Sequence, residues 1–116
     1  MNIFYIEDNQ NDANLVRRYT QSSGHNLTIV SNLNQVDEFY NGVFDIVLID
    51  VLIDQQRVGY EIANELRSQG YEGGMIAVTA LNSPQDIEAC QRAGFDAILN
   101  KPYQITELEQ ILETFS

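Results

Sequence analysis

The sequence predicts an α/β domain with a doubly wound parallel sheet of five strands and five helices. Short apolar runs alternate with amphipathic runs along all 116 residues, and this alternation is typical of a parallel sheet covered by helices on both faces. The central run, 45–50 (DIVLID), is apolar on both faces, as a buried parallel strand should be. Crossover connections are almost always right-handed, which makes a doubly wound sheet the natural arrangement.

Each strand is predicted from a short apolar run, which is typical of a buried strand. The five runs are 2–6 (NIFYI), 27–30 (LTIV), 45–50 (DIVLID), 75–80 (MIAVTA) and 97–100 (AILN).

The helices are predicted from apolar stripes between these runs. The first follows residue 11, with Asn11 or Asp12 as its N-cap and Gly24 just past its end. The fourth opens at Ser83-Pro84, which offers a capping hydroxyl and a proline for the first turn. The second helix is predicted from the stripe of Leu33, Val36, Phe39 and Tyr40, and the others at 59–68 and 105–115.

Composition and charge limit the classes of function. Seventeen acidic and six basic residues give a formal net charge of -11, which disfavours direct nucleic-acid binding because that depends on Lys and Arg. The acidic balance suits a divalent cation or a basic protein partner, although a surface kept acidic for solubility explains most of these charges equally well.

The same composition predicts a cytoplasmic protein with one domain over 1–116. Its one cysteine, Cys90, excludes an internal disulfide and fits a reducing compartment. No apolar run reaches about 18 residues, so we expect no membrane span, and the N-terminal residues lack the pattern of a signal peptide.

Polar residues follow four of the predicted strands. Glu7-Asp8 follows the first, Asp50 ends the third, Thr79-Ala80 ends the fourth, and Asn100-Lys101-Pro102 follows the fifth. Ligands of open α/β sheets bind beyond the carboxyl ends of the strands, so these side chains should converge.

Three carboxylates at one edge repel one another. Two unit charges about 4 Å apart cost roughly 4 kcal/mol at an effective dielectric constant near 20. The repulsion is relieved either by a raised pKa or by a bound cation, and an oxygen-only site with one basic neighbour suits Mg²⁺.

These positions make Asp50 the candidate nucleophile. A carboxylate held beside Mg²⁺, a hydroxyl and an ammonium group can attack phosphorus and form an aspartyl phosphate. Lys101 and Thr79 would stabilise charge on the phosphoryl oxygens. Asp54, four residues further on, is interpreted as a solvated turn residue.

The chain resembles, over essentially its full length, the receiver domain of two-component response regulators of the chemotaxis-regulator type. The resemblance is carried by the strand-end residues above, by Gly59 before the third helix, and by Gly94 in AGFDAILNKPY. It implies a flavodoxin-like sheet in the order 2-1-3-4-5.

The resemblance also implies a phosphoacceptor function. Asp50 would take a phosphoryl group from a histidine kinase or a histidine phosphotransfer protein. Asp8, Asp50 and the backbone carbonyl of Leu52 would bind Mg²⁺, with Glu7 assisting. The phosphoryl oxygens would be held by Thr79 and Lys101, and the Lys101–Pro102 bond would be cis.

In the family, phosphorylation biases a two-state equilibrium that changes the binding of a downstream protein partner at the face of the fourth helix, fifth strand and fifth helix. The sequence leaves open a homodimer through this face. The chemistry would make the chain a signalling domain with Mg²⁺-dependent self-phosphorylation and self-dephosphorylation rather than a conventional enzyme.

Three features depart from the family pattern. Ile98 stands three residues before Lys101, where family members usually carry a Tyr or Phe that turns inward on activation. The loop VLIDQQRVG after Asp50 is one residue longer than usual, with Asp54 where a proline is common.

Two other functions remain open. A pseudo-receiver would keep the fold and signal without phosphate, and Ile98 is the residue that favours it. A small aspartate-nucleophile phosphatase on a similar fold typically has a second Asp two residues after the nucleophile, where this chain has Leu52.

Overall fold

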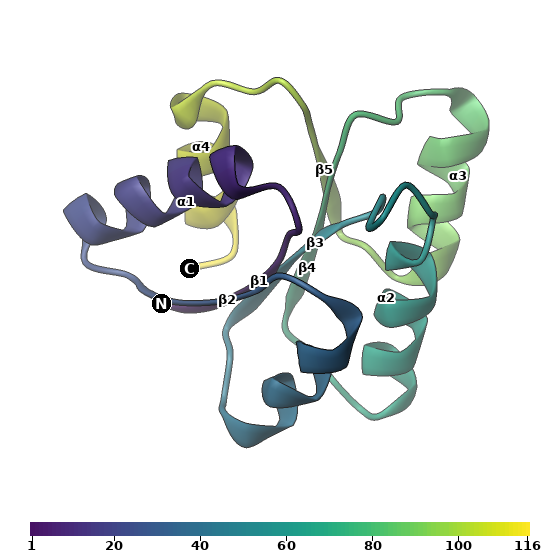
Figure 1. Cartoon of the computed structure of the whole chain (residues 1–116), viewed down its shortest axis with the longest axis horizontal. Helices are drawn as coiled ribbons and strands as arrows, with labels where there is room; N and C mark the ends of the chain where they lie inside the picture. Colours follow the sequence, from purple (N-terminus) through teal and green to yellow (C-terminus); the bar gives the residue numbers. More distant parts are fainter.

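A parallel sheet forms the centre of the molecule in the computed structural model, which describes all 116 residues (Figure 1). The strand order is β2-β1-β3-β4-β5 and all neighbours are parallel, so the predicted order is confirmed. The strands are β1 (Asn2–Ile6), β2 (Asn26–Val30), β3 (Ile46–Asp50), β4 (Gly74–Thr79) and β5 (Ala97–Asn100).

Helices cover both faces of the sheet, as Figure 1 shows. Alternate residues of β1 serve opposite faces: Ile3 and Tyr5 belong to the apolar core under α1 and α4, whereas Phe4 and Ile6 belong to the core under η1, α2 and α3. The helices are α1 (Gln10–Ser23), η1 (Leu33–Asn41), α2 (Gly59–Ser68), α3 (Pro84–Ala93) and α4 (Ile105–Thr114).

The second helix differs in type from a regular α-helix. The segment Leu33–Asn41 is a 3₁₀ helix. Three of the residues in its stripe, Leu33, Val36 and Phe39, are spaced by three, which places them on one side of a helix with three residues per turn. The stripe predicted a helix correctly but did not predict its 3₁₀ type.

The start of α1 corrects the predicted cap. Asn9, rather than Asn11 or Asp12, is the N-cap, and its side chain accepts a hydrogen bond from the Asp12 N–H. Two other caps are confirmed: Gly24 ends α1 with a φ of 80°, and the Ser83 side chain accepts from the Asp86 N–H at the start of α3.

The register of the strands places the predicted polar residues at one edge. Asp50 pairs with Val78, so Thr79 lies one residue beyond it, and Thr79 pairs with Asn100, so Lys101 lies next to that edge. Cys90 is buried in the core. None of the helices has the length and apolar character needed to cross a bilayer.

Candidate functional site

Three carboxylates meet at the carboxyl edge of the sheet, and we call Glu7, Asp8 and Asp50 the acidic site. Each provides an oxygen within 4.8 Å of the others. Glu7 and Asp50 are only 1% and 5% exposed, whereas Asp8 is half-buried. The structure therefore brings together the three acids that the sequence placed after β1 and β3.

Lys101 is the cation of this edge. Its Nζ lies 2.7 Å from Glu7 Oε1, 2.9 Å from Asp12 Oδ2 and 3.1 Å from Asp50 Oδ2. Burial alone would lower the pKa of Lys101, but its hydrogen bonds to Glu7 and Asp12 and the charges of Glu7 and Asp50 raise it above the ordinary value. Lys101 therefore carries its charge across the whole physiological pH range. The bond from Lys101 to Pro102 is cis.

Two residues of this network were missed by the sequence interpretation. Tyr5 is fully buried, and its Oη donates a hydrogen bond to Glu7 Oε1 at 2.7 Å. Asp12, considered only as a helix cap, bonds to Lys101. A signal for Tyr5 existed, because residues two apart on a strand point to the same face and a polar side chain at position 5 faces the same way as Glu7.

Asp50 is held by two hydrogen bonds, one to each carboxylate oxygen. Oδ1 accepts from the Leu52 N–H at 3.0 Å, and Oδ2 accepts from Lys101. Burial, followed by the neighbouring Glu7 carboxylate, raises the pKa of Asp50 to about 8, although Lys101 acts in the opposite direction. Without a metal the site thus relieves its repulsion partly by holding a proton.

Thr79 is buried at the end of β4, and its hydroxyl group accepts one hydrogen bond. Oγ1 accepts a hydrogen bond from the Leu81 N–H at 3.0 Å. The Thr79 carbonyl accepts from the Lys101 N–H and from Asn100 Nδ2. These bonds fix the β4 and β5 ends relative to each other and leave the hydroxyl proton of Thr79 free to donate.

The loop after Asp50 forms a tight turn against the acidic site. Ile53 and Gln56 pair in an isolated antiparallel bridge, and Asp54 and Gln55 between them have φ values of 52° and 62°. Two consecutive positive φ values are typical of a type I′ turn. Asp54 is exposed as predicted, and its N–H donates to Asp8 Oδ2 at 2.9 Å.

Gly59 begins α2 in contact with the end of β3. A Cβ at this position would lie 2.5 Å from Val51 Cα and 2.8 Å from the Asp50 carbonyl oxygen. Any residue other than glycine would push the helix and the strand apart, so the start of α2 is fixed against the backbone at Asp50.

The donor atoms of the acidic site fit a hard divalent cation. Carboxylate oxygens are the ligands that Mg²⁺ prefers. Asp8 Oδ1 has no hydrogen-bond partner, and Asp50 Oδ1 accepts only from the Leu52 N–H, so both oxygens can reach an ion. The two oxygens of Glu7 already accept from Tyr5, from Lys101 and, at 3.4 Å, from the Asn9 N–H, which favours an indirect role for this residue.

Ile98 lies in β5, at the position where family members usually carry a Tyr or Phe. It is half-buried and packs against the core on the α3 side of the sheet. Tyr103, just after Pro102, belongs to the opposite core and has a buried Oη with no hydrogen-bond partner.

Comparison with known proteins assigns the chain to a family. The model of the response regulator receiver domain matches residues 3–113. The transcriptional regulatory protein CiaR of Streptococcus pneumoniae is 24% identical over 111 residues, which are 96% of this chain and 49% of CiaR. This chain spans about half the length of the curated relatives it matches.

Solved structures of response regulators and receiver domains have the same fold as this chain. A two-component response regulator from Clostridium difficile has a TM-score of 0.91 at 15% identity, covering 99% of this chain and 94% of its own. The receiver domain of the sensor histidine kinase PA1611 from Pseudomonas aeruginosa, solved with a magnesium ion in its active-site cleft, has a TM-score of 0.86 at 28% identity, covering 98% and 95%. With its strand order and acidic edge, the chain belongs to the response regulator receiver domain family.

Proposed function

We propose that this chain is the phosphoacceptor of a two-component or phosphorelay system and that Asp50 receives the phosphoryl group. The observation that carries the proposal is the position of Asp50, which lies in the acidic site with its Oδ2 3.1 Å from Lys101 Nζ. Membership of the receiver family supports this interpretation, because such domains work between histidine kinases and downstream effectors.

In the proposed reaction a carboxylate oxygen of Asp50 attacks the phosphorus of a phosphohistidine on the donor protein. A P–O bond forms as the P–N bond breaks, and the departing imidazole nitrogen takes up a proton from solvent. The ammonium group of Lys101 and the hydroxyl group of Thr79 would bind phosphoryl oxygens as negative charge develops on them. The free hydroxyl proton of Thr79 suits this task.

Asp8, Asp50 and the backbone carbonyl of Leu52 would hold Mg²⁺, with Glu7 assisting through its charge. The ion would neutralise charge on the transferred phosphoryl oxygens. Glu7 also positions Lys101, since the two groups lie 2.7 Å apart. The partners proposed for the chain are a histidine kinase or histidine phosphotransfer protein and a downstream protein.

The test is the intact mass after incubation with a small-molecule phosphodonor such as acetyl phosphate, with and without Mg²⁺. We expect a Mg²⁺-dependent gain of one phosphoryl group in the wild type and none in Asp50→Ala. Asp54→Ala is the matched control, because this nearby acid lies in the exposed turn. A gain that persists in Asp50→Ala would reject Asp50 as the acceptor.

A pseudo-receiver is the second candidate, and Ile98 favours it. An aliphatic side chain lacks the aromatic ring that usually turns inward on activation. A wild type that binds Mg²⁺ in calorimetry but gains no phosphoryl group would support this alternative. A wild type that gains one would exclude it and leave only the switching step to explain.

A further inference from the structure

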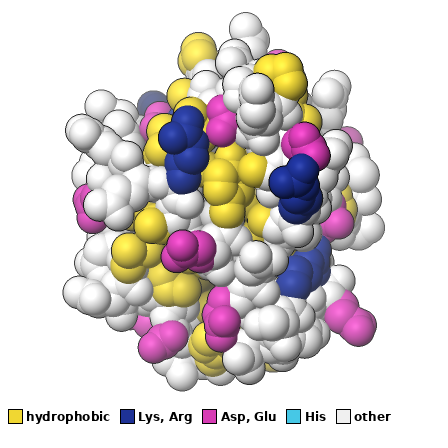
Figure 2. Space-filling view, turned by 90° about the vertical axis from the view of Figure 1, so that its right-hand side faces the viewer, with side chains coloured by type: hydrophobic (Ala, Val, Ile, Leu, Met, Phe, Trp, Pro, Cys, Tyr) yellow, Lys and Arg dark blue, Asp and Glu magenta, His cyan; other side chains and the backbone are white.

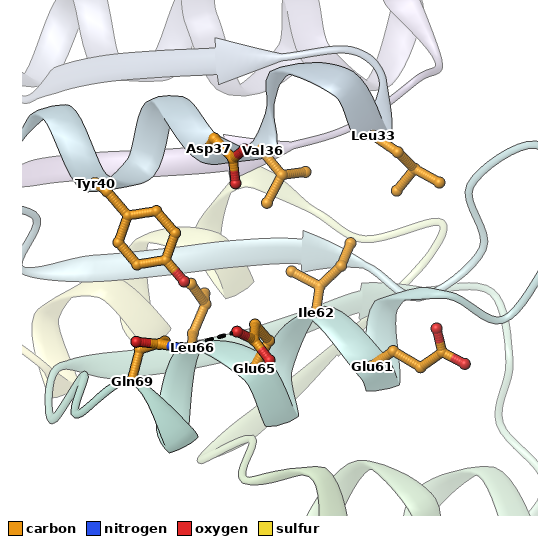
Figure 3. A pocket seen from close by; sticks show the side chains of 9 residues that line it. All are labelled: Leu33, Val36, Asp37, Tyr40, Glu61, Ile62, Glu65, Leu66 and Gln69. Carbon is orange, nitrogen blue, oxygen red and sulfur yellow. Dashed lines mark hydrogen bonds between the residues drawn. The ribbon is translucent and has the colours of Figure 1, made fainter.

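A groove separates η1 from α2 on the face of the sheet opposite α1 and α4. It encloses about 620 Å³, and its floor is formed by Val36 of η1 and by Ile62 and Leu66 of α2, whose side chains point toward one another in Figure 3. Leu33 and Tyr40 lie at its two ends and are 44% and 49% exposed. Large apolar residues therefore face solvent along the groove, which is typical of an interaction surface.

The rim of the groove is acidic. Asp37 of η1 and Glu61 and Glu65 of α2 line it and are exposed, and no basic residue does so. None of the three forms a salt bridge; Glu65 Oε1 only accepts a hydrogen bond from Gln69 Nε2 at 3.0 Å. Three neighbouring carboxylates without a cation give the groove a negative potential.

On this side of the molecule the basic side chains occupy only part of the surface, whereas Asp and Glu side chains are spread over it. Figure 2 views the side that carries α2 and α3, and the Lys and Arg side chains lie in its upper and right-hand parts. Hydrophobic side chains lie beside Asp and Glu side chains in the lower left part of the same view. The arginines of this side have acidic partners: Arg57 pairs with Asp86, Arg67 with Asp96, and Arg92 with Glu88. Their charges are therefore offset locally by these acids.

The shape of the groove suits a helix. The ten residues of α2 extend over about 15 Å, and η1 runs beside α2 across the groove (Figure 3). An amphipathic helix bound in such a groove places apolar side chains from successive turns on the floor and polar ones along the rim.

We propose that the groove between η1 and α2 binds a basic amphipathic helix of a partner protein. Its apolar stripe would pack on Val36, Ile62 and Leu66, and Lys or Arg side chains on its flanks would pair with Asp37, Glu61 and Glu65. A second copy of this chain fits poorly, because its net charge of -11 would be brought against an acidic rim. The groove lies apart from the acidic site, so this inference stands independently of the proposed phosphoryl transfer.

The test uses a synthetic helical peptide of about 15 residues, with leucines at helical spacing and lysines on both flanks. ¹⁵N-labelled protein is titrated with it, and a second peptide carries glutamates in place of the lysines. We expect the lysine peptide to shift the amide resonances of residues 33–40 and 61–69, and the glutamate peptide to shift none. Shifts that centre on α3, β5 and α4 would overturn the proposal, and this readout needs no variant.

Charge-reversal variants test the rim. Glu61→Lys combined with Glu65→Lys should weaken the binding of the fluorescein-labelled lysine peptide at least about tenfold. Glu109→Lys combined with Glu113→Lys is the matched control, because it makes the same charge change at the same spacing on the exposed side of α4. We expect the control pair to reduce the affinity for the lysine peptide at most about twofold at moderate salt. Equal losses in both pairs would mean attraction by net charge alone and would overturn the proposal.

A polar substitution at one end of the groove tests its apolar surface, to which the exposed Leu33 belongs. Leu33→Ser should weaken peptide binding several-fold, whereas Ile87→Ser on α3 should not, although Ile87 is similarly exposed at 39%. Circular dichroism melts establish that each variant is folded. Binding that does not respond to Leu33→Ser would show that the peptide does not use the apolar surface, which would equally overturn the proposal.

Discussion

Two tyrosine hydroxyl groups are buried beside the acidic site, and only one has a hydrogen-bond partner. Tyr5 donates to Glu7, whereas Tyr103 Oη has no partner. We expect Tyr5→Phe to lower the free energy of unfolding by about 1.5–3 kcal/mol, because a hydrogen bond to a buried carboxylate is lost. Tyr103→Phe is the control and should leave stability unchanged or higher. Urea denaturation measures the free energy of unfolding of both variants. Equal losses of stability would contradict a stabilising hydrogen bond from Tyr5 to Glu7.

The pKa of Asp50 makes stability depend on pH. Because this pKa is raised to about 8, the folded state binds the proton more tightly than the unfolded state, so the carboxylate destabilises the metal-free protein increasingly as pH rises from about 4 to 8. In EDTA we expect Asp50→Asn to raise the free energy of unfolding at pH 8 by about 1–2 kcal/mol, a value reduced for screening.

Denaturation at pH 5 and pH 8 checks this expectation. The stabilisation by Asp50→Asn should be smaller at pH 5, because the Asp50 carboxylate destabilises the folded state less at pH 5 than at pH 8. A stability difference that does not change between the two pH values would show that the substitution acts through packing rather than through the charge of Asp50.

The site residues that could be predicted from the sequence are those located at the end of a strand. Asp50, Thr79 and Lys101 each end or follow a strand, and parallel strands bring such ends together. Asp12 could not be placed in this way, because its contact with Lys101 depends on where α1 begins, and that is set by the cap at Asn9.

At the scale of elements, the turn after β3 holds two residues in an unfavourable conformation. Gln55 has a φ of 62°, and a non-glycine residue there costs about 1–2 kcal/mol. We expect Gln55→Gly to raise the free energy of unfolding by up to about 1 kcal/mol, since glycine's greater freedom in the unfolded chain offsets part of the gain. Gln91→Gly within α3 is the control and should lower it by about 1 kcal/mol. Thermal denaturation measures the stability of both variants. A lower stability of Gln55→Gly would contradict the inference that Gln55 is strained.

Arg67 joins the end of α2 to two loops at the amino edge of the sheet. Its guanidinium group donates hydrogen bonds to the carbonyl oxygens of Tyr71, Gly73 and Gly94. We expect Arg67→Ala to cost about 2–4 kcal/mol in unfolding free energy, because these acceptors lose a charged partner. The exposed Arg92→Ala should change it by less than about 0.5 kcal/mol. Similar losses in chemical denaturation would contradict a role for this network.

Periodicity predicted the elements better than it predicted their ends. The predicted bounds of all five strands lie within one residue of the observed ones. The type of η1 and the cap of α1 depend on local hydrogen bonds, which apolar patterning does not encode.

For the whole molecule, the net charge of -11 implies repulsion within the folded state. We expect NaCl, raised from about 20 to 200 mM, to increase Tm by a few degrees, because salt screens this repulsion. The Glu109→Lys, Glu113→Lys double variant should respond less, since it carries four fewer net negative charges. Scanning calorimetry measures the shift, and a Tm that is independent of salt would contradict the expectation.

Gly59 has a consequence that reaches beyond the packing of one residue. It fixes the first turn of α2 against the backbone at Asp50, and the same helix provides one wall of the groove. Any ligand that shifts α2 at one of these places must do work at the other, and equilibrium thermodynamics makes the two effects equal and reciprocal. A helix in the groove that favoured one position of α2 would therefore change the affinity of the acidic site by the same factor that occupancy of the acidic site changes the affinity of the groove.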